Sequence, residues 1–169
     1  IAGINTQSFS NSPWKHVLGG RAAIELRLLG ADNSTVSSVN DTFDLKDMSN
    51  FTKTVAVGKY DINIESINQT AVADTFVRFR AELKNYNVGQ NQKLDLSATT
   101  TDGLITLSKE FVKAYTTPIF DPEGAGSQEL KLGQVDGFYY LYVKGGTKGE
   151  LRFTASATGQ GLSKTLDVA

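Results

Sequence analysis

The sequence predicts an all-β protein with antiparallel sheets, and three observations lead to this class. Apolar and polar residues alternate in short runs, as in residues 60–65, where Tyr60, Ile62 and Ile64 stand between polar side chains. Turn-forming Gly, Asn, Asp and Ser separate these runs, and helical segments do not alternate with them. Successive side chains of a strand point to opposite faces, so each run gives a strand with one dry and one wet face. We therefore expect an antiparallel β-sandwich.

The stretch 51–66, FTKTVAVGKYDINIES, is the predicted centre of this arrangement. Val55 and Val57 have odd numbers, whereas the apolar residues after Gly58 have even numbers, so the buried face changes across this glycine. A change of parity requires a turn or a bulge between two extended pieces. Glycine adopts the backbone angles that such a feature needs. Residues 60–65 are therefore expected to form a core strand.

Further alternating runs predict the other strands. In the first part of the chain they cover residues 22–29, 42–46, 75–83 and 93–99, and residues 30–41 are expected to be mainly loop. In the second part they cover residues 104–107, 116–120, 129–132, 138–144, 150–157 and 162–168. Within residues 75–83 the parity places Val77 and Phe79 inside and Arg78 and Arg80 outside. SKEFVKAY, residues 108–115, is the only stretch with some helical character.

The chain of 169 residues is predicted to form two small sandwich lobes. A polar and irregular lead covers residues 1–20, and Trp14 is expected to pin it to the body of the domain. The stretch TTTDG, at residues 99–103, gives the boundary, so the lobes cover residues 21–102 and 103–169. One continuous sandwich over residues 17–169 is the alternative, because the length fits either arrangement.

The composition argues against several classes of function. The formal net charge is −1 and the Lys and Arg residues are dispersed, whereas a nucleic-acid partner requires a basic surface that neutralises phosphates. The chain has no cysteine, which excludes disulfides, thiolate metal ligands and cysteine nucleophiles. His16 is the only histidine, which excludes a two-histidine zinc site within one chain. We predict a protein that is not an enzyme.

Acidic residues form two groups in predicted loops. One group is Asp121, Glu123 and Asp136, and the other is Asp32, Asp41, Asp44 and Asp47. Asp favours turns through its own side-chain hydrogen bonds, so solvated turn residues are the simple interpretation. Calcium binding and a catalytic carboxylate pair are the alternatives, although the calcium-loop spacing DxDxDG is absent. No other cofactor is expected.

Aromatic side chains give the one candidate ligand site. The run FYYLYV, residues 138–143, is apolar on both faces, so it should be a central strand that is covered on both sides. Flat aromatic faces also stack on sugar rings, and the candidate binding residues are Trp14, Tyr115 and Tyr139. Exposure of two of these rings in one plane would favour a carbohydrate site, and burial of all of them would exclude it.

Three stretches within residues 52–157 resemble the fimbrillin-like and related surface-lipoprotein domains of Bacteroidetes-type bacteria. They are VAVGKYDINIES, TFVRFRAELKNYNVGQNQKLDLSATTTDGLITL and FYYLYVKGGTKGELRFTASA. The resemblance implies transthyretin-like or immunoglobulin-like sandwiches held at the cell surface by a lipidated cysteine ahead of the mature region. This sequence has no cysteine, so the anchor is expected on an N-terminus that precedes it. The resemblance implies no catalytic residues.

These observations favour a non-enzymatic module of a bacterial cell surface or periplasm, for structure, adhesion or assembly. Its expected partners are other surface proteins or glycans, with membrane attachment only through the lipid anchor. A carbohydrate-binding module is the main alternative. A third alternative is a strand donor or acceptor that pairs with the sheet edge of a partner.

Overall fold

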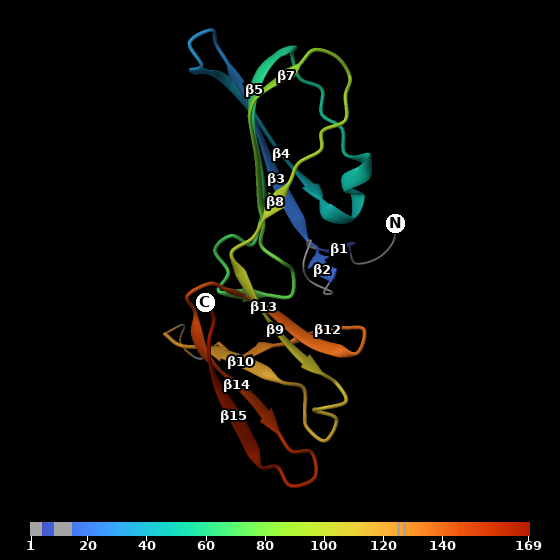
Figure 1. Ribbon diagram of the computed structural model, residues 1–169, viewed down its shortest axis with the longest axis vertical. Coiled ribbons are helices and arrows are strands. Elements are labelled where there is room, and N and C mark those ends of the chain that lie inside the picture. The colour runs from blue at the N-terminus through green and yellow to red at the C-terminus, as the bar shows by residue number, and fades with distance from the viewer. Residues whose placement is uncertain (1–4, 9–14, 125, 127) are drawn as a thin grey trace. The chain divides into compact units, whose positions relative to one another are not determined.

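The computed structural model describes residues 5–8, 15–124, 126 and 128–169. All pairs of neighbouring strands are antiparallel, which confirms the predicted all-β class (Figure 1). No helix among these residues is long and apolar enough to cross a membrane. The chain divides into two compact units, which are Ile1–Gln69 with Val77–Thr100, and Thr70–Phe76 with Thr101–Ala169.

A five-stranded sheet with the order β4-β3-β5-β7-β8 forms the first unit. Its strands are β3 (Arg21–Leu29), β4 (Thr35–Asp44), β5 (Gly58–Ser66), β7 (Arg80–Val88) and β8 (Ala98–Thr99). A hairpin of β1 (Asn5–Ser8) and β2 (Lys15–Leu18) belongs to the same unit. The predicted strands at residues 22–29 and 60–65 correspond to β3 and β5, which lie side by side in this sheet (Figure 1).

One face of the five-stranded sheet carries the core of the first unit. The buried residues of this core are Ala22, Ile24, Leu26, Phe43, Leu45, Tyr60, Ile62 and Phe79. Leu45 comes from a 3₁₀ helix, η1 (Leu45–Asn50), and Phe51, Val55 and Leu94 of irregular segments also pack on this face. The rings of Phe43 and Phe51 stack with their centroids 4.7 Å apart. A helical turn and irregular chain therefore form the second layer of this core.

Gly58 begins β5 at the point where the sequence predicts a change of buried face. Its φ is 156°, and an added Cβ would lie 2.6 Å from Cδ1 of Leu28 on the neighbouring strand. Residues 51–57 before it are irregular. The predicted extended piece before Gly58 is therefore wrong, and Val57, which was expected on its buried face, is 71% exposed. The chain turns into β5 at Gly58, and it needs glycine there because few side chains adopt this φ.

Several elements of the first unit differ from the predicted ones. β4 begins at Thr35, within the predicted loop 30–41. The sequence did not predict this strand, because most of its residues are exposed on both faces and need not alternate between apolar and polar. The predicted strand 93–99 is reduced to β8, and the predicted strand 75–83 begins only at Arg80. Its first residues are irregular because the chain passes from one unit to the other between Phe76 and Val77.

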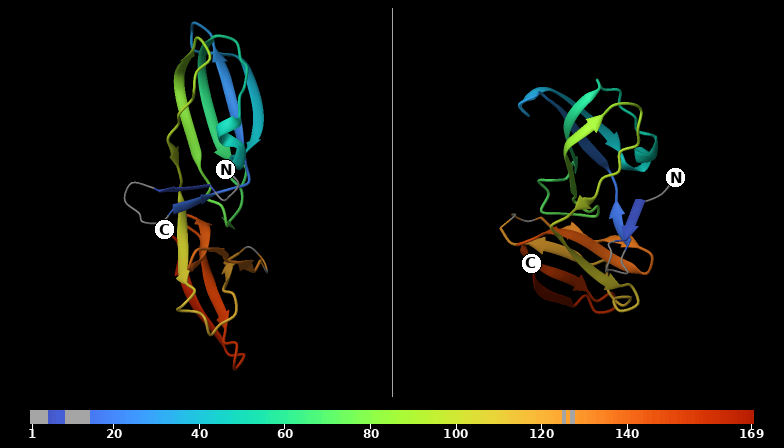
Figure 2. Two further views of the ribbon diagram at one scale, coloured as in Figure 1. Left: turned by 90° about the vertical axis from the view of Figure 1, so that its right-hand side faces the viewer. Right: turned by 45° about the horizontal axis from the view of Figure 1, so that its top comes forward.

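Two antiparallel sheets that pack on a common core form the second unit (Figure 2). One sheet has the order β11-β10-β14-β15, and in the other β13 lies between β9 on one side and β12 and β6 on the other. The strands are β6 (Ala73–Asp74), β9 (Asp102–Ser108), β10 (Ile119–Pro122), β11 (Leu130–Lys131), β12 (Gly133–Val135), β13 (Phe138–Lys144), β14 (Lys148–Thr154) and β15 (Gly161–Asp167). The buried core residues are Phe120, Leu132, Leu141, Val143 and Leu151.

Most predicted strands of the second part overlap strands of this unit, but β12 was not predicted, and the bounds of β10 and β14 differ from the predicted ones by two or three residues. β13 occupies residues 138–144 as predicted, and its residues from Tyr140 to Val143 are buried on both faces. In SKEFVKAY, Ser108 ends β9, residues 109–114 form turns and Tyr115 makes an isolated bridge, so this stretch has no helix. Val112 in these turns is buried.

The short strand β6 reaches the second unit from the connection between β5 and β7. Ala73 pairs with Val143, Asp74 pairs with Tyr142, and the N–H of Lys144 donates a 2.8 Å hydrogen bond to the carbonyl oxygen of Val72. The predicted lobe 21–102 includes this segment, whereas the structure assigns it to the second unit. Two paired residues carry too little alternation to be recognised in a sequence.

Replacing Gly149 of β14 with Ala should lower the free energy of unfolding by about 1–3 kcal/mol, as overpacked cores do. An added Cβ would meet the buried ring of Phe120 and lie 2.7 Å from the carbonyl oxygen of Asp121. Urea denaturation followed by circular dichroism measures the change. Gly161→Ala in β15 is the matched control, because nothing lies within 4 Å of an added Cβ there. Equal stability of the two variants would contradict the packing of β10 on β14.

Candidate functional site

The predicted ligand residues do not form a shared platform among the described residues. Trp14 lies outside them. Tyr115 is half-buried, bridges to Ala155 and packs at a tilt on Phe153, with ring centroids 5.8 Å apart. Tyr139 is half-buried in β13, and Nζ of Lys109 lies 5.8 Å from its ring centroid. The two tyrosines are thus neither buried nor presented as open rings.

Asp121 and Glu123 of the first predicted acidic group border one open hollow, whereas Asp136 does not line it. Asp121 of β10 forms a 2.8 Å ion pair with Arg152, Glu123 is exposed, and Asp136 lies in the turn between β12 and β13. Arg152 also pairs with Glu150 at 3.0 Å and with Glu129 at 3.5 Å. These contacts border an open hollow of about 440 Å³ whose acidic groups face a cation of the protein itself.

Two members of the second acidic group, Asp32 and Asp41, have separate local partners. Asp32 accepts hydrogen bonds from the hydroxyl and the N–H of Ser34, which lower the pKa of Asp32. Asp41 accepts a 2.6 Å hydrogen bond from Nζ of Lys53, which lowers the pKa of Asp41. Within the ranges that the structure covers, no group of three or more His, Asp or Glu side chains is arranged to hold a metal ion.

His16 lies in β2 and is half-buried. Burial lowers the pKa of its imidazole, because desolvation disfavours the charged form. A neutral histidine in a hairpin strand is consistent with a packing role.

The solvent face of the five-stranded sheet carries a series of ion pairs between neighbouring strands. Glu65 of β5 pairs with Arg80 of β7 at 3.1 Å. Lys84 of β7 lies 3.4 Å from Asp61 of β5 and 2.7 Å from Glu82. An open hollow of about 540 Å³ lies on this face, bordered by β3, β4 and β5. Its floor includes a small side chain, Ala23, between longer polar neighbours, which gives a shallow surface and no enclosed cavity.

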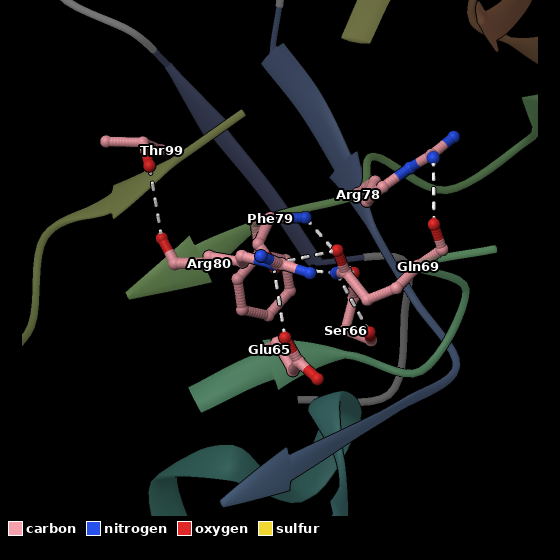
Figure 3. Close-up of polar contacts among 7 residues, drawn as sticks. All are labelled: Glu65, Ser66, Gln69, Arg78, Phe79, Arg80 and Thr99. Carbon is pink, nitrogen blue, oxygen red and sulfur yellow. Dashed lines mark hydrogen bonds and ion pairs between the residues drawn. The ribbon is translucent and has the colours of Figure 1, made fainter. Parts of the chain in front are cut away.

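A polar cluster closes the end of β5, where the chain leaves the first unit (Figure 3). The side-chain nitrogen of Gln69 donates to the carbonyl oxygens of Ser66 and Phe79, at 3.0 Å each, and to Oγ of Ser66 at 2.9 Å. Its side-chain oxygen accepts from Nε of Arg80 at 3.1 Å. Oγ of Ser66 also accepts from the N–H of Phe79. Gln69 therefore links the two places in the first unit where residues 70–76 leave it and where the chain returns.

Arg78 belongs to this cluster. The prediction that its side chain points outward from a strand is wrong. Its side chain is buried, and Nη1 donates a 3.0 Å hydrogen bond to the main-chain carbonyl oxygen of Gln69. Parity does not apply to Arg78, because residues 77–79 are not part of a strand. Alternation alone gave no signal for this cluster.

Three long strands form open sheet edges among the described residues. β4, with ten residues, pairs only with β3, whereas β9 and β15, with seven each, pair only with β13 and β14, respectively. Two of these edges have one charged residue on the core-facing side, namely Asp41 between Val39 and Phe43 in β4, and Lys164 between Leu162 and Leu166 in β15. Inward-pointing charges are characteristic of edge strands. A charge at an apolar position of the alternation is the sequence signal that could have identified both edges.

No protein-family model matches the chain, and no curated protein or solved structure matches it significantly. The resemblance to fimbrillin-like domains therefore stays a prediction. Function has to be inferred from the geometry of the chain itself.

Replacing Gln69 with Ala should lower the free energy of unfolding by about 1–3 kcal/mol, because carbonyl oxygens at the end of β5 lose their donor. Urea denaturation measures this change. Gln160→Ala is the matched control, since this exposed residue uses only backbone atoms in its hydrogen bonds. If the free energy of unfolding falls no more in Gln69→Ala than in Gln160→Ala, the hydrogen bonds of Gln69 do not stabilise the chain where residues 70–76 leave the first unit.

Proposed function

We propose that this chain is a non-enzymatic module of a bacterial cell surface or periplasm, with a role in structure, adhesion or assembly. The observation that carries the proposal is the use of charge on the solvent face of the five-stranded sheet. There, Glu65, Asp61 and Glu82 lie beside the cations of Arg80 and Lys84. Two of these pairs, that of Glu65 with Arg80 and that of Asp61 with Lys84, join β5 to β7, which suits a structural sheet surface.

The electrostatics of these carboxylates support the same proposal. A hydrogen bond from the N–H of Asn85 and the nearby Lys84 lower the pKa of Asp61. A hydrogen bond from Ser163 and the neighbouring Arg152 lower the pKa of Glu150. General acid catalysis needs a pKa near the working pH, which these environments oppose. The two hollows are also shallow, unlike the deep sites that enclose small substrates.

The resemblance to fimbrillin-like surface domains adds a location to this proposal. We expect an antibody against the chain to label intact cells of its source organism without permeabilisation, and added protease to remove the label. A protein confined to the cytosolic fraction would contradict the proposal. Loss of adhesion in a deletion strain would separate adhesion from a purely structural role.

Carbohydrate binding is the second candidate, and exposed aromatic residues near the start of β13 favour it. The N–H of Lys109 donates to the carbonyl oxygen of Gly137 at 2.9 Å, which joins the segment that carries Phe111 to the start of β13. Phe111 is 78% exposed and Phe138 is 42% exposed. Aromatic faces next to a lysine can stack on a sugar ring and bind its hydroxyls.

A glycan array tests this second candidate. If Phe111 or Tyr139 stacks on a bound sugar, replacing that residue with Ala should reduce the array signal at least about tenfold, since it removes a stacking surface. Val57→Ala is the control, because Val57 is an apolar residue of the first unit that is 71% exposed. Selective binding that all three variants retain would place the site elsewhere, and no binding to any glycan would reject the candidate.

A further inference from the structure

Two of the open edges, β4 and β15, carry a charged core-facing residue, and their backbone groups alternate between the sheet and the open side. The N–H of Leu45 bonds to the carbonyl oxygen of Gly20, so odd-numbered residues of β4 bond to β3 and Ser38, Asn40 and Thr42 point their backbone groups outward. In β15 the N–H of Val168 bonds to the carbonyl oxygen of Thr147. By the same alternation, Ser163, Thr165 and Asp167 point outward in β15.

The core-facing side chains of the two edges are complementary. β15 offers Leu162, Lys164 and Leu166 in this order, and β4 offers Val39, Asp41 and Phe43. Leu162 is 44% exposed although it stands on the core-facing side, so it lacks a neighbour beyond the edge. On each edge, one charged side chain thus lies between two apolar side chains, and the charges of Lys164 and Asp41 have opposite sign.

We propose that β15 of one copy of this chain pairs antiparallel with β4 of a second copy. In this register Lys164 faces Asp41, Leu162 faces Phe43 and Leu166 faces Val39 of the other copy. The outward-pointing residues then meet as hydrogen-bonded pairs, Ser163 with Thr42, Thr165 with Asn40 and Asp167 with Ser38. The hydrogen bonding and the side-chain complementarity therefore select the same register.

Other pairings of these edges are less favourable. A shift by two residues places Lys164 opposite Val39 or Phe43. If β15 pairs with β15 of a second copy, Lys164 faces either another Lys164 or a leucine. If β4 pairs with β4 of a second copy, Asp41 likewise faces either another Asp41 or one of the apolar residues Val39 and Phe43. Like charges or a charge beside an apolar residue destabilise a cross-strand pair. Only the pairing of β15 with β4 matches every core-facing residue.

In a single unpaired molecule, the Asp41 side chain caps a backbone group of the β4 edge, and it also determines where the partner strand binds. Its Oδ1 accepts a 2.8 Å hydrogen bond from the outward N–H of Thr42, and its Oδ2 pairs with Lys53. The carboxylate thus lies at the edge itself. When β15 of a second copy binds, its Lys164 ammonium pairs with the Asp41 carboxylate. The N–H of Thr42 then donates to the carbonyl oxygen of Ser163 in place of Oδ1 of Asp41.

The pairing joins two different surfaces, so each copy keeps one free β4 and one free β15. Heterologous contacts of this kind produce rings or open chains of subunits. The inference deepens the proposed function by naming a second copy as the partner in assembly, and it rests on that function only for its biological setting. Single edge contacts are small, so association should be concentration-dependent.

Sedimentation equilibrium of the whole chain over a range of concentrations tests the proposal. Lys164→Glu and Asp41→Lys should each raise the dissociation constant about tenfold or more, because each places like charges opposite each other. An equimolar mixture of the two variants should associate again through the remaining complementary edges, Glu with Lys. Thr165→Pro removes an outward N–H without touching the core and should also abolish association. Association that these changes leave unaltered would overturn the proposal.

Cross-linking fixes the register, because the chain has no cysteine of its own. Ser163→Cys and Thr42→Cys proteins, mixed and oxidised, should give a disulfide-linked heterodimer in preference to either homodimer. Ser38→Cys replaces Thr42→Cys as the matched control and should not cross-link. A wild-type chain that stays monomeric at every concentration, or preferential homodimers, would overturn the pairing. Surface labelling of cells would be unaffected by that outcome, so the proposed function is tested separately.

Discussion

The pairing of backbone N–H and C=O groups between antiparallel strands is the constraint on which this structure depends. A buried backbone group without a partner is costly, so each core strand needs a neighbour on both sides. β3 and β5 have such neighbours in the first unit, as β13 and β14 do in the second. Among the described residues, the strands at the ends of the sheets have such a neighbour on one side only.

The same constraint explains the polar cluster around Gln69. Residues 70–76 leave the first unit to supply β6 to the second, so the backbone where they depart cannot complete a strand pair. The side chain of Gln69 supplies hydrogen bonds there, and Arg78 is buried to bind its main-chain carbonyl oxygen. A short strand exchanged between two parts of one chain thus requires a side-chain network at its base.

Strands that are buried on one face could be predicted from the sequence, because burial imposes a period of two on Ile24, Leu26, Tyr60 and Ile62. β13 was also predictable, since only a central strand is apolar on both sides. The exposed edge strand β4 could not, because neither of its faces must be apolar. Nor could the layer formed by η1 and Phe51, which depends on contacts between distant residues. The half-burial of the candidate ligand residues Tyr115 and Tyr139 follows from packing on Phe153 and beneath Lys109, which are contacts that the sequence does not reveal.

Residue-resolved amide hydrogen exchange along β15, measured by NMR in dilute solution, tests the edge geometry most directly. If β15 pairs on one side only and in the stated register, the amides of Leu162, Lys164 and Leu166 exchange slowly and those of Ser163, Thr165 and Asp167 exchange fast. Uniform protection of all six amides, or protection of the opposite set, would contradict it.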